Sequence, residues 1–111
     1  MSKIKKEKNR RPIHAGETLL QDFLTPLGVT QSELARAIGV SFQKVNEIVQ
    51  QKRDITADTA LRFSKFFGTT PSYWLKMRMA NDLYKSRLKL RLEIDAIRPL
   101  ASPKASLDLL S

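Results

Sequence analysis

Apolar residues recur at helical spacing along residues 12–67, and this stretch contains no alternating pattern typical of a β-strand. The spacing predicts a first amphipathic helix over about residues 16–25, which Pro26 and Gly28 should end. Together with the patterns that follow, it favours an all-α fold.

Capping residues mark the second and third predicted helices. Thr30 and Glu33 form a capping box, and Gly39 supplies the left-handed residue that ends the second helix. Ser41 is the N-cap of a third helix that runs to about Gln50. The residues expected to face inward are Leu34, Ala35, Ile38, Val45, Ile48 and Val49.

Two more helices follow a polar turn. Thr56 is the predicted N-cap of a fourth helix that ends at Gly68, and Thr70 with Pro71 begins a fifth. The residues of the fourth helix expected to face inward are Ala60, Leu61, Phe63 and Phe67.

Residues 87–97 fit two patterns. Leucine or isoleucine alternates with charged residues here, as in a strand, but Leu83, Leu90 and Ile94 also share one face of a helix. We favour a helix to about residue 98, because Pro99 is a natural stop and no partner strand is evident. Residues 99–111 are interpreted as a tail.

The segment from residue 31 to residue 48 has the sequence logic of a helix-turn-helix, whose second helix enters the DNA major groove. Ala35 is small enough for two helices to cross closely, and Gly39 permits the sharp turn between them. The seven positions that carry this pattern are Leu34, Ala35, Ile38, Gly39, Val40, Val45 and Ile48. The alternative is a helical bundle that binds no DNA.

The charge of the chain favours a polyanionic partner. Its net charge is +9, and the excess lies in residues 1–11, with a net charge of +5, and in residues 71–98, with +4, while residues 12–70 are neutral. We expect residues 1–11 to form a flexible basic arm, and expect the two basic flanks to frame a separate recognition element.

If the third helix docks as such helices do, its outward face would read bases. Gln, Asn and Glu side chains can bond base edges, while helix N-termini and cationic side chains suit phosphates. The candidate DNA-binding residues are Gln31, Ser41, Gln43, Lys44, Asn46, Glu47, Gln50, Lys52 and Arg53. Phe42 either packs beside Val45, which we favour, or touches a thymine methyl group.

Several classes of protein are disfavoured. The chain has no cysteine and one histidine, so thiolate chemistry and multi-histidine metal sites are excluded, and we expect no cofactor. His14 could pair with Glu17 or Asp22, but a cap or surface role is the better interpretation, and we expect no enzyme activity. No apolar run is long enough to span a membrane, so the cytoplasm is the expected location.

Three segments and the helix-turn-helix between them resemble the HigA antitoxins, also described as VapI-type plasmid-maintenance antidote proteins of the Xre/Cro repressor class. The segments are residues 12–17 (PIHAGE), 55–62 (ITADTALR) and 67–75 (FGTTPSYWL). The resemblance runs from about Arg11 to Leu100, with Ala15 standing where the family usually has proline.

The resemblance implies a five-helix, lambda-repressor-like DNA-binding domain over residues 12–98 with a long C-terminal dimerisation helix. It further implies a homodimer that binds an inverted-repeat operator in its own promoter, and a HigB-type toxin partner that is a ribosome-dependent mRNA endonuclease. The residues that match the family's dimerisation segment are Trp74, Leu75, Met79, Leu83 and Tyr84. Trp74 could instead complete the core of the monomer.

Two other functions stay open at this point. The chain could be a stand-alone Xre-family transcriptional regulator without a toxin. It could also be a protein–protein adaptor whose basic flanks bind RNA or a membrane surface. A preference for one DNA sequence would separate both repressor hypotheses from the adaptor.

Overall fold

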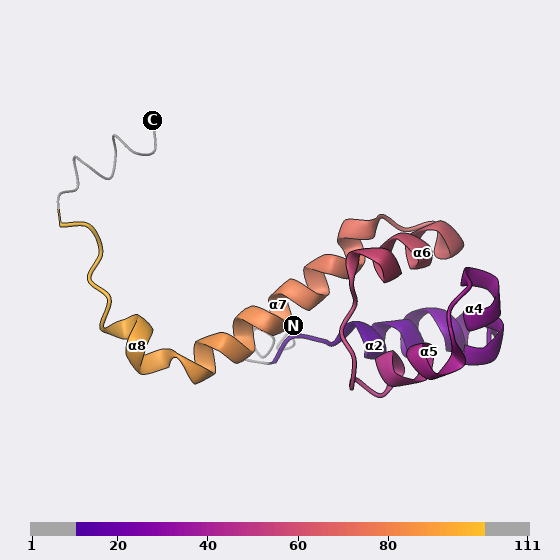
Figure 1. The fold of residues 1–111 in the computed structure, drawn as a ribbon, viewed down its shortest axis with the longest axis horizontal. Coiled ribbons are helices and arrows are strands. Elements are labelled where there is room, and N and C mark those ends of the chain that lie inside the picture. Colours follow the sequence, from indigo (N-terminus) through magenta and orange to yellow (C-terminus); the bar gives the residue numbers. More distant parts are fainter. Residues whose placement is uncertain (1–10, 102–111) are drawn as a thin grey trace, which may run out of the picture.

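The computed structural model describes residues 11–101, and all regular secondary structure in that range is helical (Figure 1). The all-α prediction is therefore confirmed. The elements are α2 (Ala15–Thr18), η1 (Leu19–Leu24), α3 (Thr25–Leu27), α4 (Gln31–Ile38), α5 (Phe42–Val49), α6 (Ala57–Phe67), α7 (Pro71–Lys89) and α8 (Arg91–Asp95). Residues 1–10 of the predicted arm (1–11) and residues 102–111 of the predicted tail (99–111) lie outside the described residues.

The first three elements form one continuous helix, and Pro26 lies inside it. The prediction that Pro26 ends this helix is wrong. The helix widens into the π-helical segment η1 just before the proline, where the Thr25 N–H bonds to the Leu20 carbonyl. A wide turn accommodates a residue that lacks an N–H and that would crowd the preceding turn of a regular α-helix. Gly28, at φ 68°, then ends the helix.

The predicted caps are present. The Glu33 N–H donates to Thr30 Oγ1 over 3.0 Å, and the Thr30 N–H donates to Glu33 Oε1 over 2.8 Å, which completes the capping box. Ser41 Oγ accepts from the Lys44 N–H over 3.1 Å at the start of α5. Gly39 has φ 75° and ends α4 as expected. Because these hydrogen bonds join residues close in the sequence, the ends of the helices can be predicted from the sequence alone.

Trp74 is the largest side chain in the core, and none of its surface is exposed. Its ring lies within about 5 Å, centroid to centroid, of Phe23 and Phe63, and its indole N–H donates to Thr69 Oγ1 over 2.8 Å. Trp74 therefore completes the core of the monomer, and its side chain offers no surface to a second protomer.

The prediction for Leu61 is wrong, because this side chain is 58% exposed. Ala60 and Phe63, its neighbours on α6, are completely buried and occupy the face that packs on the core. Leu61 points instead along the outer side of α6, where it borders a groove shared with α4.

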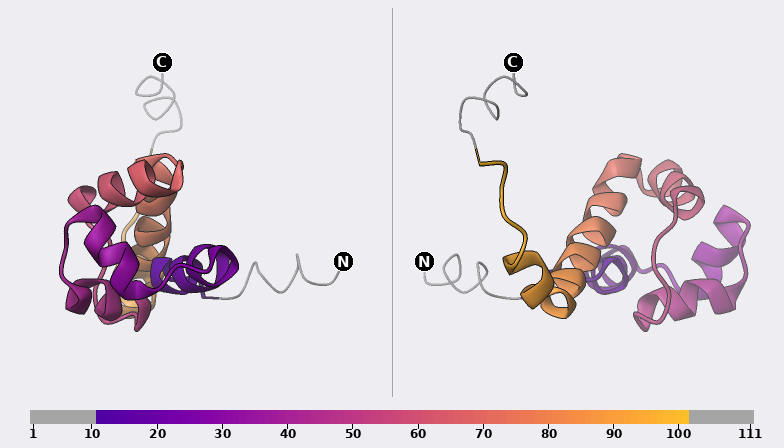
Figure 2. Two further views of the ribbon diagram at one scale, coloured as in Figure 1. Left: turned by 90° about the vertical axis from the view of Figure 1, so that its right-hand side faces the viewer. Right: turned by 60° about the vertical axis from the view of Figure 1, so that its left-hand side comes forward.

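The long C-terminal helix is confirmed only in part. Helix α7 leaves the helical body as one rod, but the chain bends at Leu90, and α8 ends at Asp95 rather than near residue 98 (Figures 1 and 2). Alternate residues lie about 200° apart on a helix, so one straight helix cannot hold Leu88, Leu90 and Leu92 on the same face. No strand forms between residues 87 and 97.

Two polar side chains attach α7 to the rest of the protein. Arg78 donates from Nη1 to the carbonyl of Ile55 over 2.9 Å, and Asn81 donates from Nδ2 to the carbonyl of Ile13 over 3.0 Å. Asn81 is buried, so this bond satisfies a polar group that water does not reach. The orientation of α7 is thus tied to the loop after α5 and to the start of the first helix.

The start of the first helix rests directly on the end of α5. A Cβ atom at Gly16 would overlap the carbonyl oxygen of Ile48. The Gly16 N–H donates to Nδ1 of His14 over 2.9 Å, which makes His14 the N-cap of α2. Position 16 therefore requires glycine because the two backbones are in contact.

We expect Gly16→Ala to destabilise the protein by about 3 kcal/mol, because the new methyl group must push the first helix away from α5. Gly28→Ala is the matched control, since Gly28 also lies at a helix end but has open space around it. Its positive φ should cost the control only about 1 kcal/mol. Urea unfolding measures both values, and equal losses would contradict the close-contact explanation.

Candidate nucleic-acid interface

Helix α5 is anchored by one face and open on the other. Val45 and Ile48 are completely buried against the rest of the core, and Ala35 of α4 is buried with them. Gln43 and Gln50 point to solvent, while Asn46 and Glu47 are partly exposed. The predicted helix-turn-helix is thus present, with α4 and α5 joined through Gly39 and Val40.

We use the term reading face for the polar surface formed by the outward side of α5, the start of α4 and the turn after α5. Of the residues predicted to bind DNA, it contains Gln31, Gln43, Asn46, Glu47, Gln50, Lys52 and Arg53. Ser41 is the N-cap of α5, and the half-buried Lys44 lies at the side of α5 toward Asp58 of α6. Hydrogen bonds within the reading face organise it into two clusters.

The first cluster joins the two helices. Asn46 donates from Nδ2 to Oε1 of Gln31 over 3.1 Å, and both side chains are partly exposed. The bond connects the middle of α5 to the first residue of α4, so neither amide is free to rotate independently.

The second cluster runs along the outward side of α5 from Gln43 to Glu47 and includes Arg53 in the turn that follows. Arg53 donates from Nε to one oxygen of Glu47 over 2.9 Å, and its Nη2 forms an ion pair with the same oxygen at 2.7 Å. Gln43 donates to the other oxygen over 3.1 Å. The hydrogen bond from Arg53, followed by that from Gln43, lowers the pKa of Glu47 below its ordinary value. Glu47 is therefore ionised at neutral pH.

A tight turn places Lys52 and Arg53 beside α5. Gln51 adopts a left-handed conformation, with φ 63°, and the Lys52 N–H bonds back to the Glu47 carbonyl over 2.8 Å. Both basic side chains are exposed. Cationic side chains at the end of a recognition helix are well placed for phosphate contacts.

Phe42 is half exposed, at 50%, so it does not pack fully beside Val45 as we had favoured. Phe42 is the first residue of α5, so few core side chains lie close enough to cover its ring. Its ring is available on the same helix as the reading face.

The chain segment just before the first helix converges on α7, the helix that belongs to the second basic flank. Asn81 bonds to Ile13, so the chain just after Arg11 runs against the helix that carries the second basic cluster (Figure 1). Lys85 follows Asn81 by one helical turn. The sequence could not show this convergence, because almost 70 residues separate the two partners.

The contacts of His14 indicate a structural role. His14 caps the first helix through Nδ1, in agreement with the cap interpretation favoured from the sequence, and its Nε2 lies 3.5 Å from Oδ1 of Asp54. Within residues 11–101, no three His, Asp or Glu side chains are grouped closely enough to hold a metal ion. In the same range, no helix combines the length and apolarity needed to cross a bilayer.

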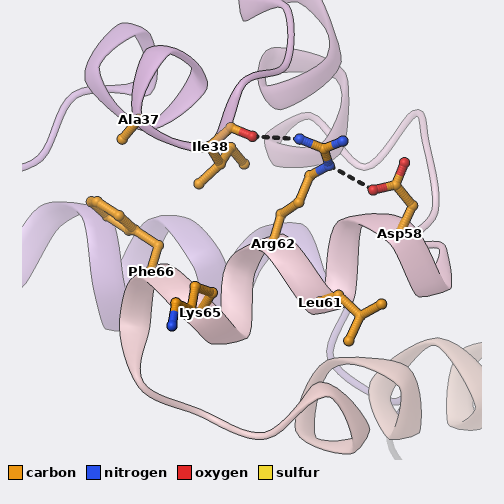
Figure 3. Close-up of a pocket in the computed structure, with 7 residues that line it drawn as sticks. All are labelled: Ala37, Ile38, Asp58, Leu61, Arg62, Lys65 and Phe66. Carbon is orange, nitrogen blue, oxygen red and sulfur yellow. Dashed lines mark hydrogen bonds and ion pairs between the residues drawn. The ribbon is translucent and has the colours of Figure 1, made fainter.

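A groove of about 580 Å³ lies between α4 and α6, apart from the reading face (Figure 3). Arg62 spans it, donating to the Ile38 carbonyl over 2.7 Å and to Asp58 over 2.6 Å. Arg62 thereby stabilises the C-terminal end of α4, a role that sequence reasoning missed. The spacing of Asp58 and Arg62 suits an i,i+4 pair, but nothing local indicates the contact with Ile38.

Comparison with known proteins agrees with this architecture. Residues 20–74 match the helix-turn-helix family. Virulence-associated protein I of Dichelobacter nodosus is 42% identical over 92% of this chain and 94% of its own length. Antitoxin HigA-1 of Vibrio cholerae is 35% identical over 82% of this chain and 86% of its own length.

A solved structure extends the comparison to a complex. The Pseudomonas aeruginosa antitoxin HigA, solved with the higBA promoter, superposes with a TM-score of 0.77 at 36% identity. The match covers 81% of this chain and 99% of that one.

We expect Gln43→Ala and Asn46→Ala each to weaken binding to a selected DNA duplex by about 1–3 kcal/mol and to leave binding to random DNA nearly unchanged. Lys52→Ala is the control for a phosphate contact. It should weaken binding to both duplexes and lower the salt dependence by about one unit of slope. Fluorescence anisotropy titrations at several salt concentrations measure these effects. Equal losses on both duplexes for Gln43→Ala and Asn46→Ala would remove these residues from base reading.

Proposed function

The chain belongs to the Xre-type helix-turn-helix family of HigA antitoxins, and we propose that it represses its own operon as a dimer and neutralises a small HigB-like toxin. The substrate of that toxin would be mRNA, as the family resemblance implies. Repression would act through an inverted-repeat operator, one half of which is read by each protomer.

The observation that carries the DNA-binding part is the reading face itself. Its polar side chains project from a helix whose opposite face is completely buried at Val45 and Ile48. Base readers act best from a rigid element, because each hydrogen bond then costs little ordering on binding. The similar P. aeruginosa HigA, solved with promoter DNA, supports the same mode of binding here.

We assign base contacts to Gln31, Gln43, Asn46 and Gln50, on the outward side of α5 and at the start of α4. Phosphate contacts go to Ser41, Lys44, Lys52 and Arg53, because these residues lie at helix ends or in the following turn. Glu47 is the one acidic member of the reading face.

The surface of α7 supports dimerisation. Met79 is 56% exposed and Leu83 is 46% exposed, one helical turn apart, while Leu75 and Tyr84 are partly buried beside them. Exposed apolar residues continue into α8, where Leu92 is 80% exposed and Ile94 is 45% exposed. An exposed apolar surface of this kind is typical of a protein interface, and a second copy of α7 would cover it.

We expect Leu83→Lys to weaken the dimer at least about tenfold, because it places a charge in an apolar interface. Leu61→Lys is the matched control, since Leu61 is an equally exposed leucine on a different helix. Sedimentation velocity over a concentration series measures the dimer dissociation constant. A Leu83→Lys protein that dimerises like the wild type would exclude α7 as the interface.

The toxin partner is tested by purification from the native locus. We expect intact-mass measurement of the tagged protein to reveal a stoichiometric small partner that cleaves mRNA once it is separated. A bare homodimer recovered while the neighbouring genes are expressed would favour a stand-alone Xre-family regulator.

A further inference from the structure

Glu47 is an unusual residue to find on a surface that faces DNA. A carboxylate close to phosphates is repelled by them, and this repulsion is weak only if a cation lies beside it. In principle Glu47 could still read a base, because a carboxylate accepts a hydrogen bond from the amino group of cytosine. The geometry of its oxygens decides between these roles.

Both oxygens of Glu47 already accept hydrogen bonds within the protein. Oε1 accepts a hydrogen bond from Arg53 Nε at 2.9 Å and forms an ion pair with Nη2 at 2.7 Å, and Oε2 accepts a hydrogen bond from Gln43 at 3.1 Å. A base donor would therefore have to share Oε2 with the Gln43 amide or displace a bond to the carboxylate, and such charge-assisted bonds are about twice as strong as neutral ones.

The backbone supports the same arrangement. The turn after α5 reverses the chain through Gln51, and the Lys52 N–H closes it onto the carbonyl of Glu47. This brings Arg53 back to Glu47, which lies in the last turn of α5. Glu47 engages Nε and Nη2 of the guanidinium, which leaves the Nη1 donors for a DNA oxygen.

We propose that Glu47 is a positioning residue, which holds Arg53 and Gln43 in the orientation needed to bind DNA and does not read a base itself. The inference rests on the DNA-binding function proposed above. Glu47 fixes the Arg53 guanidinium beside α5 and directs the Gln43 amide, and Arg53 in return neutralises the carboxylate that phosphates would otherwise repel.

A double-mutant cycle tests this proposal. The proposal predicts that the effect of Glu47→Ala on DNA affinity changes sign when Arg53 is replaced by alanine. With Arg53 present, Glu47→Ala should weaken binding to a selected duplex roughly tenfold, since Arg53 and Gln43 lose their common anchor. In the Arg53→Ala background, Glu47→Ala should instead strengthen binding a few-fold, because it removes an unpaired negative charge next to the phosphates. The duplex is one selected in vitro with the wild-type protein.

A base-reading Glu47 would give a different result. Glu47→Ala would then weaken binding by the same factor in both backgrounds, and this outcome would overturn the proposal. Glu47→Gln should recover part of the affinity lost in Glu47→Ala, since an amide oxygen can still accept from Arg53. Glu93→Gln, on the exposed helix α8, makes the same change of net charge away from the reading face and should leave binding unchanged.

Thermal unfolding and duplex selection by the wild-type protein show which part of the proposal fails. Thermal unfolding of each variant separates loss of binding from loss of the fold. If the wild-type protein selects no duplex and binds all DNA alike, the proposed function fails. If the wild-type protein selects a duplex but the double-mutant cycle shows no change of sign, the DNA-binding proposal stands and the positioning role of Glu47 is wrong.

Discussion

The contact between Gly16 and the carbonyl of Ile48 is the constraint on which the position of α5 depends. A recognition helix of eight residues has too little surface to orient itself, so its direction must come from its neighbours. The backbone of the first helix meets the last turn of α5 without a side chain between them. His14 completes the junction, because it caps the first helix and its other ring nitrogen faces Asp54 just beyond α5.

The same junction connects α5 to the proposed dimer helix. Ile13 lies next to His14 and bonds to Asn81 of α7, and Ile55 lies next to Asp54 and bonds to Arg78 of α7. Two chain segments that flank the base of α5 are thus both held by α7. The distance between the two reading faces in a dimer would therefore follow from the packing of α7 on its partner.

What the sequence predicted well is local. Each predicted cap depends on residues within four positions, so its geometry can be predicted from the local sequence. These caps are the capping box at Thr30, the N-cap at Ser41 and the left-handed Gly39. The candidate reading face was predicted for the same reason, since helical periodicity alone separates Val45 and Ile48 from Gln43 and Asn46.

What the sequence did not predict depends on distant partners. Helical spacing could not show that Trp74 would fill the monomer core or that Leu61 would be left outside it, because both share the periodicity of true core residues. The end of the first helix was misplaced because a π-helical turn ahead of Pro26 has no simple sequence signal. The pairing of Glu47 with Arg53 depends on the turn at Gln51, whose left-handed conformation is uncommon for a residue other than glycine.

The bond between Asn46 and Gln31 has a consequence for which purine this surface would accept. Because Asn46 donates and the Gln31 oxygen accepts, the Asn46 oxygen remains as an acceptor and the Gln31 amino group as a donor outside this bond. Adenine presents the complementary arrangement in the major groove, with an amino donor at N6 beside an acceptor at N7. Guanine presents two acceptors, and its O6 would meet the Asn46 oxygen, so the polarity of one internal hydrogen bond would discriminate between the two purines.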